Sequence, residues 1–346
     1  MVFLSTEQAA SLPRAWGPPL GTARLKATPE DFLVEEQTGL CPCGDGEHLW
    51  LWVEKRGLNT AQVARALAEA AGIHPRAVSF AGLKDKHALT RQWFSLQSPG
   101  RSLPLGVGEG PIPGVRILIA RRHHRKLRTG ALKGNRFVLT LRDCDADPAA
   151  VAQRLYRIST QGVPNYFGHQ RFGRGGGNLA QASAWFAGGR PPRDRKLRGL
   201  LLSSVRSELF NRVLARRVGE GSWNRLLPGE VAMLDGRGAV FETDPADPAL
   251  PGRCARLEIH PTGPLAGERG VQPGGEVAAL ERSVLAAEPL WHQGLARARM
   301  EAARRALRLR VVDLAWHWPA PGRLQLSFRL PAGAYATVVV REVLEC

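Results

Sequence analysis

One carboxylate, Asp85, lies among basic residues in the segment 78–92, which reads VSFAGLKDKHALTRQ. Lys84 and Lys86 flank it and His87 follows. Because a positive charge within a few ångströms favours the ionised form of a carboxyl group, we expect these neighbours to lower the pKa of Asp85. An ionised aspartate in a basic loop can act as a nucleophile or as a general base. A solvated surface turn is the simpler interpretation of an isolated Lys-Asp-Lys. Evidence from the rest of the chain is therefore needed to choose between a reactive carboxylate and a surface turn.

The sequence contains no complete motif for binding a metal ion or a cofactor. Cys41, Cys43 and His48 could supply three ligands of a zinc site, but structural zinc usually needs a second, distant pair of ligands, and the sequence offers none. The glycine-rich segment 173–177 lacks the Gly-Lys-Ser/Thr that completes a phosphate-binding loop, and no G-x-G-x-x-G opens a βαβ unit. We therefore predict a reaction that needs neither metal nor cofactor.

The charge of the chain indicates a polyanionic partner. It has 346 residues, with 48 Lys and Arg against 31 Asp and Glu, which gives a formal net charge of +17. Residues 114–142 hold nine Lys or Arg and no acid, and residues 190–198 hold five more against Asp194. A GC-rich genome alone would also raise the arginine content, but clustering favours a nucleic-acid surface. The basic loop 121–128 supplies the predicted contacts to the RNA backbone, through Arg121, Arg122, Arg125, Lys126 and Arg128.

Simple patterns outline the elements that must position Asp85. Alternation after a Pro-Glu-Asp turn predicts a strand over 32–36, and two further strands are expected at 48–54 and 92–96. Asn59 and Gln62 have the spacing of a capping box, which predicts a helix that ends at Gly72. Further on we expect a helix capped by Asp147, helices over 200–218 and 288–310, strands at 117–120, 137–141 and 324–330, and a β-rich segment at 337–340.

These elements favour an α+β protein rather than a doubly wound sheet. The hydrophobic content of 44% fits a folded globular chain. No apolar run reaches the roughly 18–20 residues that cross a bilayer, and residues 1–20 lack the pattern of a signal peptide, so we expect a cytoplasmic protein. Five scattered cysteines do not suggest a disulfide framework.

Taken together, the favoured carboxylate, the basic loops and the aromatic residues near glycines suit an enzyme that extracts a base from RNA, stacks it and attacks it. Each aromatic residue alone is more often part of a core. The competing class is a non-catalytic basic RNA-binding protein or RNA chaperone, which charge and aromatics alone do not exclude. A metal-dependent RNA-modifying enzyme is disfavoured for want of ligands.

Six stretches in order along the chain carry a resemblance to a known family. They are Lys26-Ala-Thr-Pro-Glu-Asp-Phe-Leu-Val-Glu35, the segment 79–92 around Asp85, Gly134-Asn-Arg-Phe137, Asn165-Tyr-Phe-Gly-His-Gln-Arg-Phe-Gly173, Pro261-Thr-Gly-Pro-Leu-Ala-Gly267 and Leu330-Pro-Ala-Gly-Ala-Tyr-Ala-Thr337. Over nearly its whole length the chain resembles the TruD family of tRNA pseudouridine synthases.

The resemblance implies a reaction and the residues that perform it. Members isomerise a uridine in tRNA, at position 13 in bacteria, to pseudouridine without metal or cofactor. The nucleophilic aspartate of the family's A-G-x-K-D motif falls on Asp85. Substrate-contacting positions fall on Phe32, Asn135 and Tyr335, the last at a position where the family often has Phe. Lys26 and Phe137 match the basic and aromatic residues near the family's active site.

The resemblance also implies a domain organisation and a set of partners. A pseudouridine synthase-like catalytic domain with a mixed, largely antiparallel sheet is expected from residues 1–161 and 308–346. A second α/β domain is expected as an insertion over residues 162–307, with the active site in the basic cleft between the two. The implied partner is tRNA, with no membrane association and no protein partner required.

Overall fold

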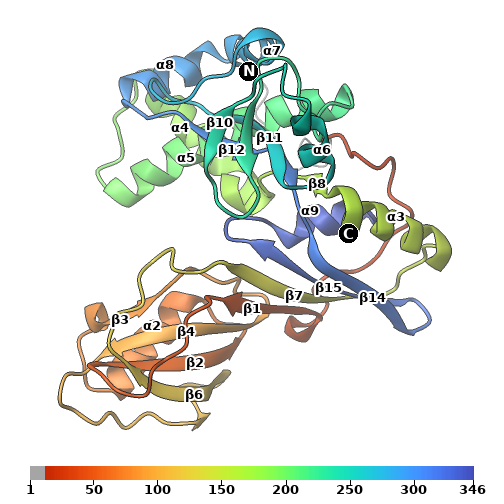
Figure 1. Cartoon of the computed structure of the whole chain (residues 1–346). Helices are drawn as coiled ribbons and strands as arrows, with labels where there is room; N and C mark the ends of the chain where they lie inside the picture. The colour runs from red at the N-terminus through yellow and green to blue at the C-terminus, as the bar shows by residue number, and fades with distance from the viewer. Residues whose placement is uncertain (1–11) are drawn as a thin grey trace. The chain divides into compact units, whose positions relative to one another are not determined.

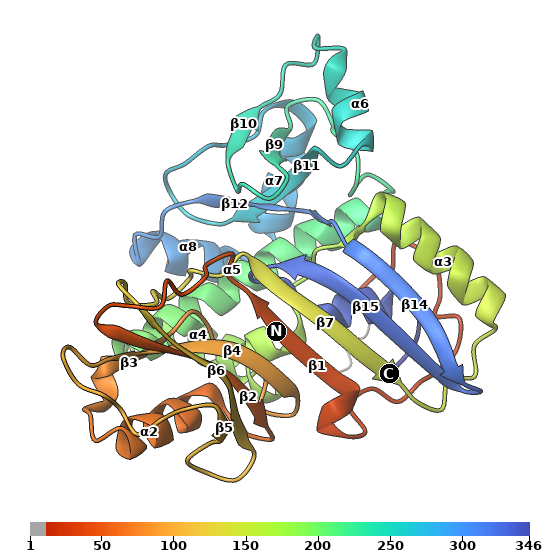
Figure 2. The ribbon, with the colours of Figure 1, turned by 60° about the horizontal axis from the view of Figure 1, so that its bottom comes forward.

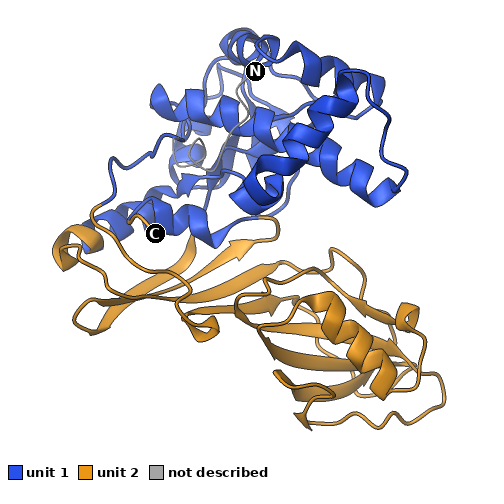
Figure 3. Ribbon diagram, turned by 180° about the vertical axis from the view of Figure 1, so that it is seen from behind, with its two compact units in different colours: residues 1–19, 152–310, 334–343 blue, residues 20–151, 311–333, 344–346 orange. Residues whose placement is uncertain are grey.

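The protein divides into two compact units in the computed structural model, which describes residues 12–346 (Figure 3). Unit 2 comprises residues 20–151, 311–333 and 344–346, and unit 1 comprises, among the described residues, 12–19, 152–310 and 334–343. The predicted insertion, residues 162–307, falls inside unit 1. The boundaries of a catalytic domain at 1–161 and 308–346 stay a prediction, and residues 1–11 of it lie outside the described residues.

Unit 2 is built on one large sheet, whose strands lie side by side in Figures 1 and 2. Its nine strands run in the order β14-β15-β7-β1-β4-β2-β6-β5, with β3 paired to β4. β1 and β4 pair in parallel, and the other pairings of this sheet are antiparallel, which confirms the expected mixed sheet. The strands are β1 (Phe32–Gln37), β2 (His48–Arg56), β3 (Val78–Phe80), β4 (Leu89–Gln97), β5 (Gly108–Glu109), β6 (Val115–His123), β7 (Gly134–Leu141), β14 (Val312–Ala320) and β15 (Arg323–Pro331).

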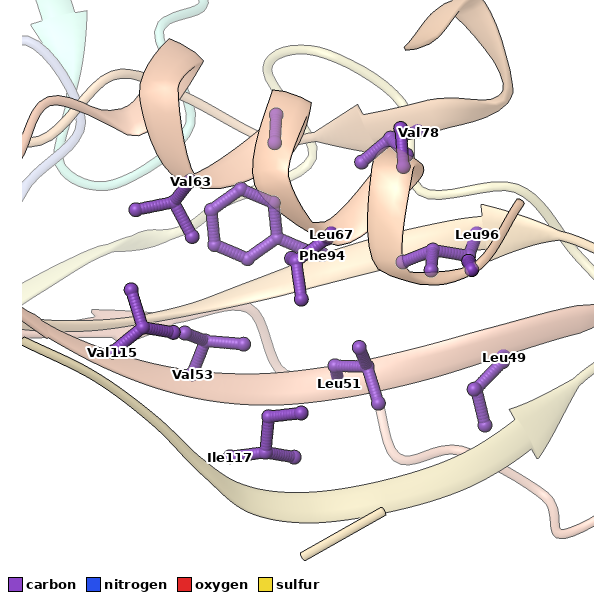
Figure 4. Close-up of a cluster of buried hydrophobic side chains, with 13 residues drawn as sticks. Leu49, Leu51, Val53, Val63, Leu67, Val78, Phe94, Leu96, Val115 and Ile117 are labelled. Atoms are coloured by element: carbon purple, nitrogen blue, oxygen red, sulfur yellow. The ribbon is translucent and has the colours of Figure 1, made fainter. Parts of the chain in front are cut away.

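A single helix, α2 (Thr60–Ala70), covers part of one face of this sheet. The predicted capping box begins it, since Asn59 Oδ1 accepts from the Gln62 amide at 2.9 Å and the Gln62 side chain accepts from the Asn59 amide. Val63 and Leu67 are fully buried and pack on Leu51, Val53 and Phe94 of the strands below (Figure 4). Val78 of β3 and Leu96 of β4 belong to the same cluster, so it anchors both strands that flank the Asp85 loop in the chain.

Unit 1 combines helices with two small sheets. A four-stranded sheet runs β10-β9-β11-β12, and β13 pairs with β8. Its long helix α5 has a row of buried residues and contacts β11 and α4 (Figure 1). The elements are α3 (Pro148–Gln161, whose first residues belong to unit 2), β8 (Val163–Pro164), α4 (Gly177–Phe186), α5 (Arg195–Gly219), β9 (Val231–Leu234), β10 (Val240–Glu242), α6 (Ala249–Ala255), β11 (Ile259–Leu265), α7 (Gly275–Ala286), α8 (Pro289–Arg297), β12 (Ala303–Ala306), β13 (Arg308–Leu309) and α9 (Ala336–Arg341). Four short 3₁₀ turns complete the described chain, η1 (Pro29–Asp31), η2 (Pro75–Ala77), η3 (His169–Phe172) and η4 (Arg174–Gly176).

Two local predictions were wrong. The helix expected over 288–310 ends at Arg297, because residues 303–306 pair with β11 as a strand and Arg304 turns inward to bind Glu281 at 2.6 Å. The β-rich segment 337–340 forms helix α9, in which Val338, Val339 and Val340 are all buried. Packing all round a short helix outweighed the β-propensity of valine here. Among the described helices, none is both long and apolar enough to cross a bilayer.

Candidate active site

The strand register of unit 2 gathers one set of side chains on a single face of the sheet. Glu36 of β1 lies opposite Asn135 of β7, and Val34 lies between Phe137 of β7 and Thr90 of β4. Thr90 in turn lies opposite Lys55 of β2. Because side chains alternate along a strand, residues two apart from these positions share their face. This face therefore includes Phe32, Glu36, Lys55, Thr90, Asn135 and Phe137.

The Asp85 loop lies between β3 and β4 and is tied to this face by its backbone. Buried Lys55 donates from Nζ to the carbonyl oxygen of Asp85 at 2.8 Å and to that of Leu58 at 2.6 Å. Gln92 Nε2 donates to the carbonyl of Gly82 at 3.1 Å, and the Lys84 amide donates to Thr60 Oγ1 at 2.9 Å. Groups from β2, β4 and α2 therefore fix the path of the loop from Gly82 to Asp85.

The buried position of Lys55 destabilises the charged form of its side chain. Burial lowers the pKa of Lys55 to about 8, against the attraction of the Asp85 charge, which raises it. A lysine whose charged form is destabilised in this way is held for the hydrogen bonds that it donates rather than for a salt bridge. Nothing in the sequence around the end of β2 indicates that this lysine is buried.

Lys84 does not serve Asp85 as the sequence suggested. Its ammonium group turns inward and pairs with Glu36 Oε2 at 2.7 Å, with both side chains buried. Glu36 also accepts from the Trp93 amide at 3.3 Å. Since an ion pair this deep is costly to break, Lys84 anchors the loop to β1. Lys86, the other flanking lysine, is exposed.

The cation beside Asp85 is Lys26, which comes from a segment 59 residues earlier. Its Nζ forms an ion pair with Asp85 Oδ2, and the two side chains are 22% and 21% exposed. The His87 amide donates to Asp85 Oδ1 at 3.0 Å. Burial raises the pKa of Asp85, but the Lys26 hydrogen bond and charge, with the His87 amide, outweigh it and hold the pKa below the ordinary value. Asp85 is thus an ionised carboxylate in a half-buried place.

The Thr-Pro-Glu-Asp turn that precedes β1 positions Lys26. Asp31 accepts from the Thr28 amide at 2.9 Å and pairs with the Arg142 guanidinium at 2.8 Å. Lys26 itself has a positive φ of 60°, which is uncommon for a residue other than glycine. Its ammonium group lies 4.2 Å from the centre of the Phe32 ring, a cation–π geometry. The turn therefore brings Lys26 to the carboxylate and to the aromatic ring together.

The predicted aromatic residues of unit 2 meet on the same face. The rings of Phe32 and Phe137 pack edge to face with centroids 6.2 Å apart, and Phe328 of β15 continues the row. Both predicted residues are buried, with exposures of 5% and 6%. Lys26, Phe32, Phe137 and Asp85 thus form one continuous series of contacts.

Asn135 and Thr90 each hold a polar atom with nothing to bind among the described residues. Asn135 Oδ1 and Thr90 Oγ1 are buried and have no hydrogen-bond partner. An unsatisfied buried acceptor is expensive, and in native proteins it often marks a place for a ligand group. Asn135 was among the predicted substrate contacts. Thr90 was not, although it stands in the same motif as Asp85, five residues along the chain.

Tyr335 belongs to unit 1, whereas the residues described above belong to unit 2. Its ring packs on Phe167 with centroids 6.4 Å apart, and Arg305 lies 4.0 Å from the centre of that Phe167 ring. A Cβ on Gly168 would come within 3.1 Å of the Tyr335 ring, so the Gly168 position favours glycine here. Residues of the quoted 165–173 motif therefore support Tyr335 within unit 1.

The predicted basic loop begins as part of a strand. β6 extends to His123, because Arg121 and Arg122 pair with Trp50 and Leu49 of β2. The Arg122 guanidinium donates to the carbonyl of Ser98 at 3.0 Å and so supports the neighbouring loop. Trp50 Nε1 donates to the Arg125 carbonyl at 2.9 Å and Leu127 is buried, which leaves the side chains of Arg121, Arg125, Lys126 and Arg128 exposed.

Comparison with known sequences matches this chain to one family. The sequence model of the family described as tRNA pseudouridine synthase D (TruD) matches residues 17–183 and 187–343. The chain is 50% identical over 345 residues to the tRNA pseudouridine synthase D of Nitrosococcus oceani, covering 99% of this chain and 96% of that one. It is 51% identical over 335 residues to the protein of the same name from Pseudomonas aeruginosa, covering 96% and 93%.

A solved structure is similar in fold. A crystal structure from Methanosarcina mazei, assigned provisionally as a tRNA pseudouridine synthase D, superposes with a TM-score of 0.72 and covers 98% of this chain and 97% of its own. The two sequences are 21% identical, so this likeness supports the fold alone.

Proposed function

Because the chain belongs to the TruD family of tRNA pseudouridine synthases, which isomerise uridine in tRNA to pseudouridine, we propose that Asp85 carries this reaction and that the uridine is at position 13. The observation that carries the proposal is the Lys26–Asp85 ion pair, which keeps a half-buried carboxylate ionised beside the Phe32 ring. A non-catalytic RNA-binding protein, the other class that the charge suggested, has no need of such a constellation.

The reaction breaks the N1–C1′ bond of uridine and forms a C5–C1′ bond, after which C5 loses its hydrogen and N1 gains one. An ionised Asp85 can assist as a nucleophile at C1′ or at C6, or as a base that removes a proton from the ribose. In each case the carboxylate must be ionised before substrate arrives. Lys26 meets that requirement, and the loop clamp from Lys55 and Lys84 fixes where the carboxylate stands.

The remaining site residues receive roles from their positions. We assign Phe32 and Phe137 to the aromatic wall that retains the detached base, and Asn135 to a hydrogen bond with the uracil or its ribose through the side chain that lacks a partner. Tyr335 of unit 1 is retained as a predicted substrate contact. Arg121, Arg125, Lys126 and Arg128 are assigned to phosphates of the tRNA, whereas the Arg122 guanidinium, also a predicted contact, is held by the Ser98 carbonyl of the neighbouring loop.

The wider assignments rest on the family. The reaction requires no cofactor and no protein partner under this proposal, the substrate is tRNA, and the protein works in the cytoplasm. Residues 162–307 are assigned to the inserted domain, and residues 1–161 and 308–346 to the catalytic domain.

Chemical mapping tests the proposed position. Unmodified tRNA is incubated with the protein, labelled with a pseudouridine-specific reagent and read by primer extension. We expect one new stop that reports position 13, and none after incubation with a heat-inactivated sample. A stop at another uridine would overturn the position while leaving the activity, and the absence of any stop would overturn the proposed activity.

A further inference from the structure

Two segments that the reaction does not use meet on the surface of unit 2. Cys43 and Asp45 lie between β1 and β2, and His123 and His124 lie at the end of β6, about 80 residues later. Donor atoms of Cys43, Asp45 and His124 all lie within 4.8 Å of one another. Among the described residues they form the one group of three or more His, Cys, Asp or Glu that could hold a metal ion.

The distances within this group suit coordination of a single ion. His124 Nε2 is 3.2 Å from Asp45 Oδ1, and Cys43 Sγ is 3.3 Å from His123 Nδ1. A tetrahedral zinc ion with bonds of roughly 2.0–2.3 Å places its donor atoms roughly 3.3–3.8 Å apart. These two pairs stand close to this spacing, and the donor atoms of Cys43, Asp45 and His124 all lie within 4.8 Å of one another. His123 lies outside this group of three but beside Cys43, whose amide donates to His123 Nδ1 at 3.4 Å, and that nitrogen is the nearest further donor.

The backbone beneath the group is fixed, so the donors are held near one another without an ion. The Gly44 amide donates to the Arg122 carbonyl at 2.9 Å, and the Arg122 guanidinium donates back to the Gly46 carbonyl at 3.3 Å. A Cβ at Gly46 would lie 2.6 Å from the backbone of His123 and His124, an approach that requires glycine. The segment around Cys43 is therefore clamped to the end of β6.

We propose that Cys43, Asp45 and His124, with His123 as a fourth donor, form a binding site for a divalent transition-metal ion of the zinc class. Thiolate and imidazole are the ligands that Zn²⁺ prefers, whereas Mg²⁺ and Ca²⁺ require oxygen ligands throughout. The thiolate and the carboxylate together balance the charge of the ion. The ion-bound site is therefore neutral, once the thiol has lost its proton on binding.

The sequence alone does not reveal this set, because proximity along the chain suggests His48 as the partner of Cys43, whereas the fold brings His124 to it. His48 is the histidine nearest Cys43 along the chain, but it is buried, and its Nδ1 lies 3.4 Å from Ser95 Oγ. His124 reaches the cysteine only because β2 and β6 are neighbours in the sheet, with His48 opposite His123. The proposed ion would hold the segment around Cys43 to the first residues of the basic segment. It is a structural site, and it takes no part in the reaction at Asp85.

Cobalt titration tests the site, since a Co²⁺–thiolate bond gives a charge-transfer absorption band in the near ultraviolet. The reduced full-length protein is titrated with Co²⁺ in the presence of excess Mg²⁺. We expect one equivalent to produce the band and one equivalent of Zn²⁺ to remove it. Cys43→Ser should abolish the band, and His124→Asn should weaken Co²⁺ binding at least tenfold.

Cys41→Ser is the matched control, because Cys41 is an exposed cysteine two residues from Cys43 and outside the group. It should keep both the band and the affinity. Circular dichroism confirms that each variant is folded, as expected for exposed positions. A band that survives Cys43→Ser, an affinity that His124→Asn leaves unchanged, or the absence of saturable binding at one equivalent would each overturn the proposal.

Discussion

The Asp85 site and the Cys43 group are both assembled from segments far apart in the chain, but they balance charge in different ways. At Asp85 the chain supplies its own cation, Lys26, and hydrogen bonds from three other elements fix the loop around the carboxylate. In the Cys43 group the donors are a thiol, a carboxylate and imidazoles, all at the surface or near it. Lys26 keeps the Asp85 carboxylate ionised for the reaction, whereas we propose that the surface donors bind an ion.

The burial of the two carboxylates explains this difference. The Asp85 side chain is 21% exposed and that of Asp45 is 75% exposed. Water screens an exposed charge, so neighbouring charges alter its behaviour little. A half-buried carboxylate depends on its neighbours, so the placement of Lys26 decides its protonation. Changes near Asp85 should therefore affect the chemistry strongly, and changes near Cys43 should affect it weakly.

The largest effect among the neighbours of Asp85 is expected from Lys26→Met. Without the ammonium group, burial raises the pKa of Asp85, since the counteracting hydrogen bond and charge are lost. A charged hydrogen bond is worth about 1.5–3 kcal/mol, so kcat/KM should fall roughly tenfold to a hundredfold. The acid limb of the pH–rate profile should also move to higher pH.

Lys86→Met is the control for that experiment, because Lys86 is exposed in the same loop. Its profile should superimpose on that of the wild type. If the acid limb of the Lys26→Met profile stays where it is in the wild type, Lys26 does not set the ionisation of Asp85.

A smaller effect is expected from Lys55→Met, which removes the donor to the carbonyl of Asp85 without touching its carboxylate. We expect kcat to fall severalfold with KM nearly unchanged, because the loop loses one of its ties. Lys55 also gives a signature in stability. Its pKa is about 8 in the fold against 10.5 unfolded, so the unfolded chain binds more protons between these values and the free energy of unfolding rises with pH there.

Chemical denaturation at several pH values measures this signature. The difference in the free energy of unfolding between wild type and Lys55→Met should change across pH 8 to 10.5 in favour of the wild type. A difference that does not vary with pH would mean that Lys55 is not destabilised by burial.

Near the Cys43 group, replacing Arg125 and Lys126 by Ala should change binding and leave chemistry nearly intact. If both side chains contact tRNA phosphates, the plot of log K against log[salt] should become shallower by about one per lost contact. Affinity should weaken for all tRNAs, while kcat at saturating tRNA changes little. Binding titrations at several salt concentrations give the slope. An unchanged slope would mean that Arg125 and Lys126 do not contact phosphates, and residues 190–198 would be the next candidates for these contacts.

The smallest effect is expected from removal of metal. Dialysis against a chelator should leave the rate of isomerisation at saturating tRNA unchanged, because the proposed ion lies outside the Asp85 site. If the chelator abolishes activity and added Zn²⁺ restores it, the isomerisation depends on a metal ion, and the Asp85 site does not work independently of metal.

Local signals predicted the parts of the fold in which one segment determines its own structure. The capping box at Asn59 and the cap at Asp147 placed the starts of α2 and α3, since the caps are satisfied within a few residues. Segments 303–306 and 337–340 were mispredicted because partners distant in sequence determined their structure. The same limit applies to the site. The inward turn of Lys84 to Glu36 and the burial of Lys55 depend on the sheet register, which no local pattern reveals.

Tritium release tests whether the Asp85 carboxylate performs the isomerisation. Hydrogen must leave C5 before pseudouridine is complete, so tRNA made with [5-³H]uridine reports each turnover. We predict that Asp85→Asn releases no tritium above background, while filter binding shows an affinity for tRNA within about threefold of wild type. Lys86→Met, assayed beside it, should release tritium at the wild-type rate. Substantial release by Asp85→Asn would show that the Asp85 carboxylate is not required for the isomerisation.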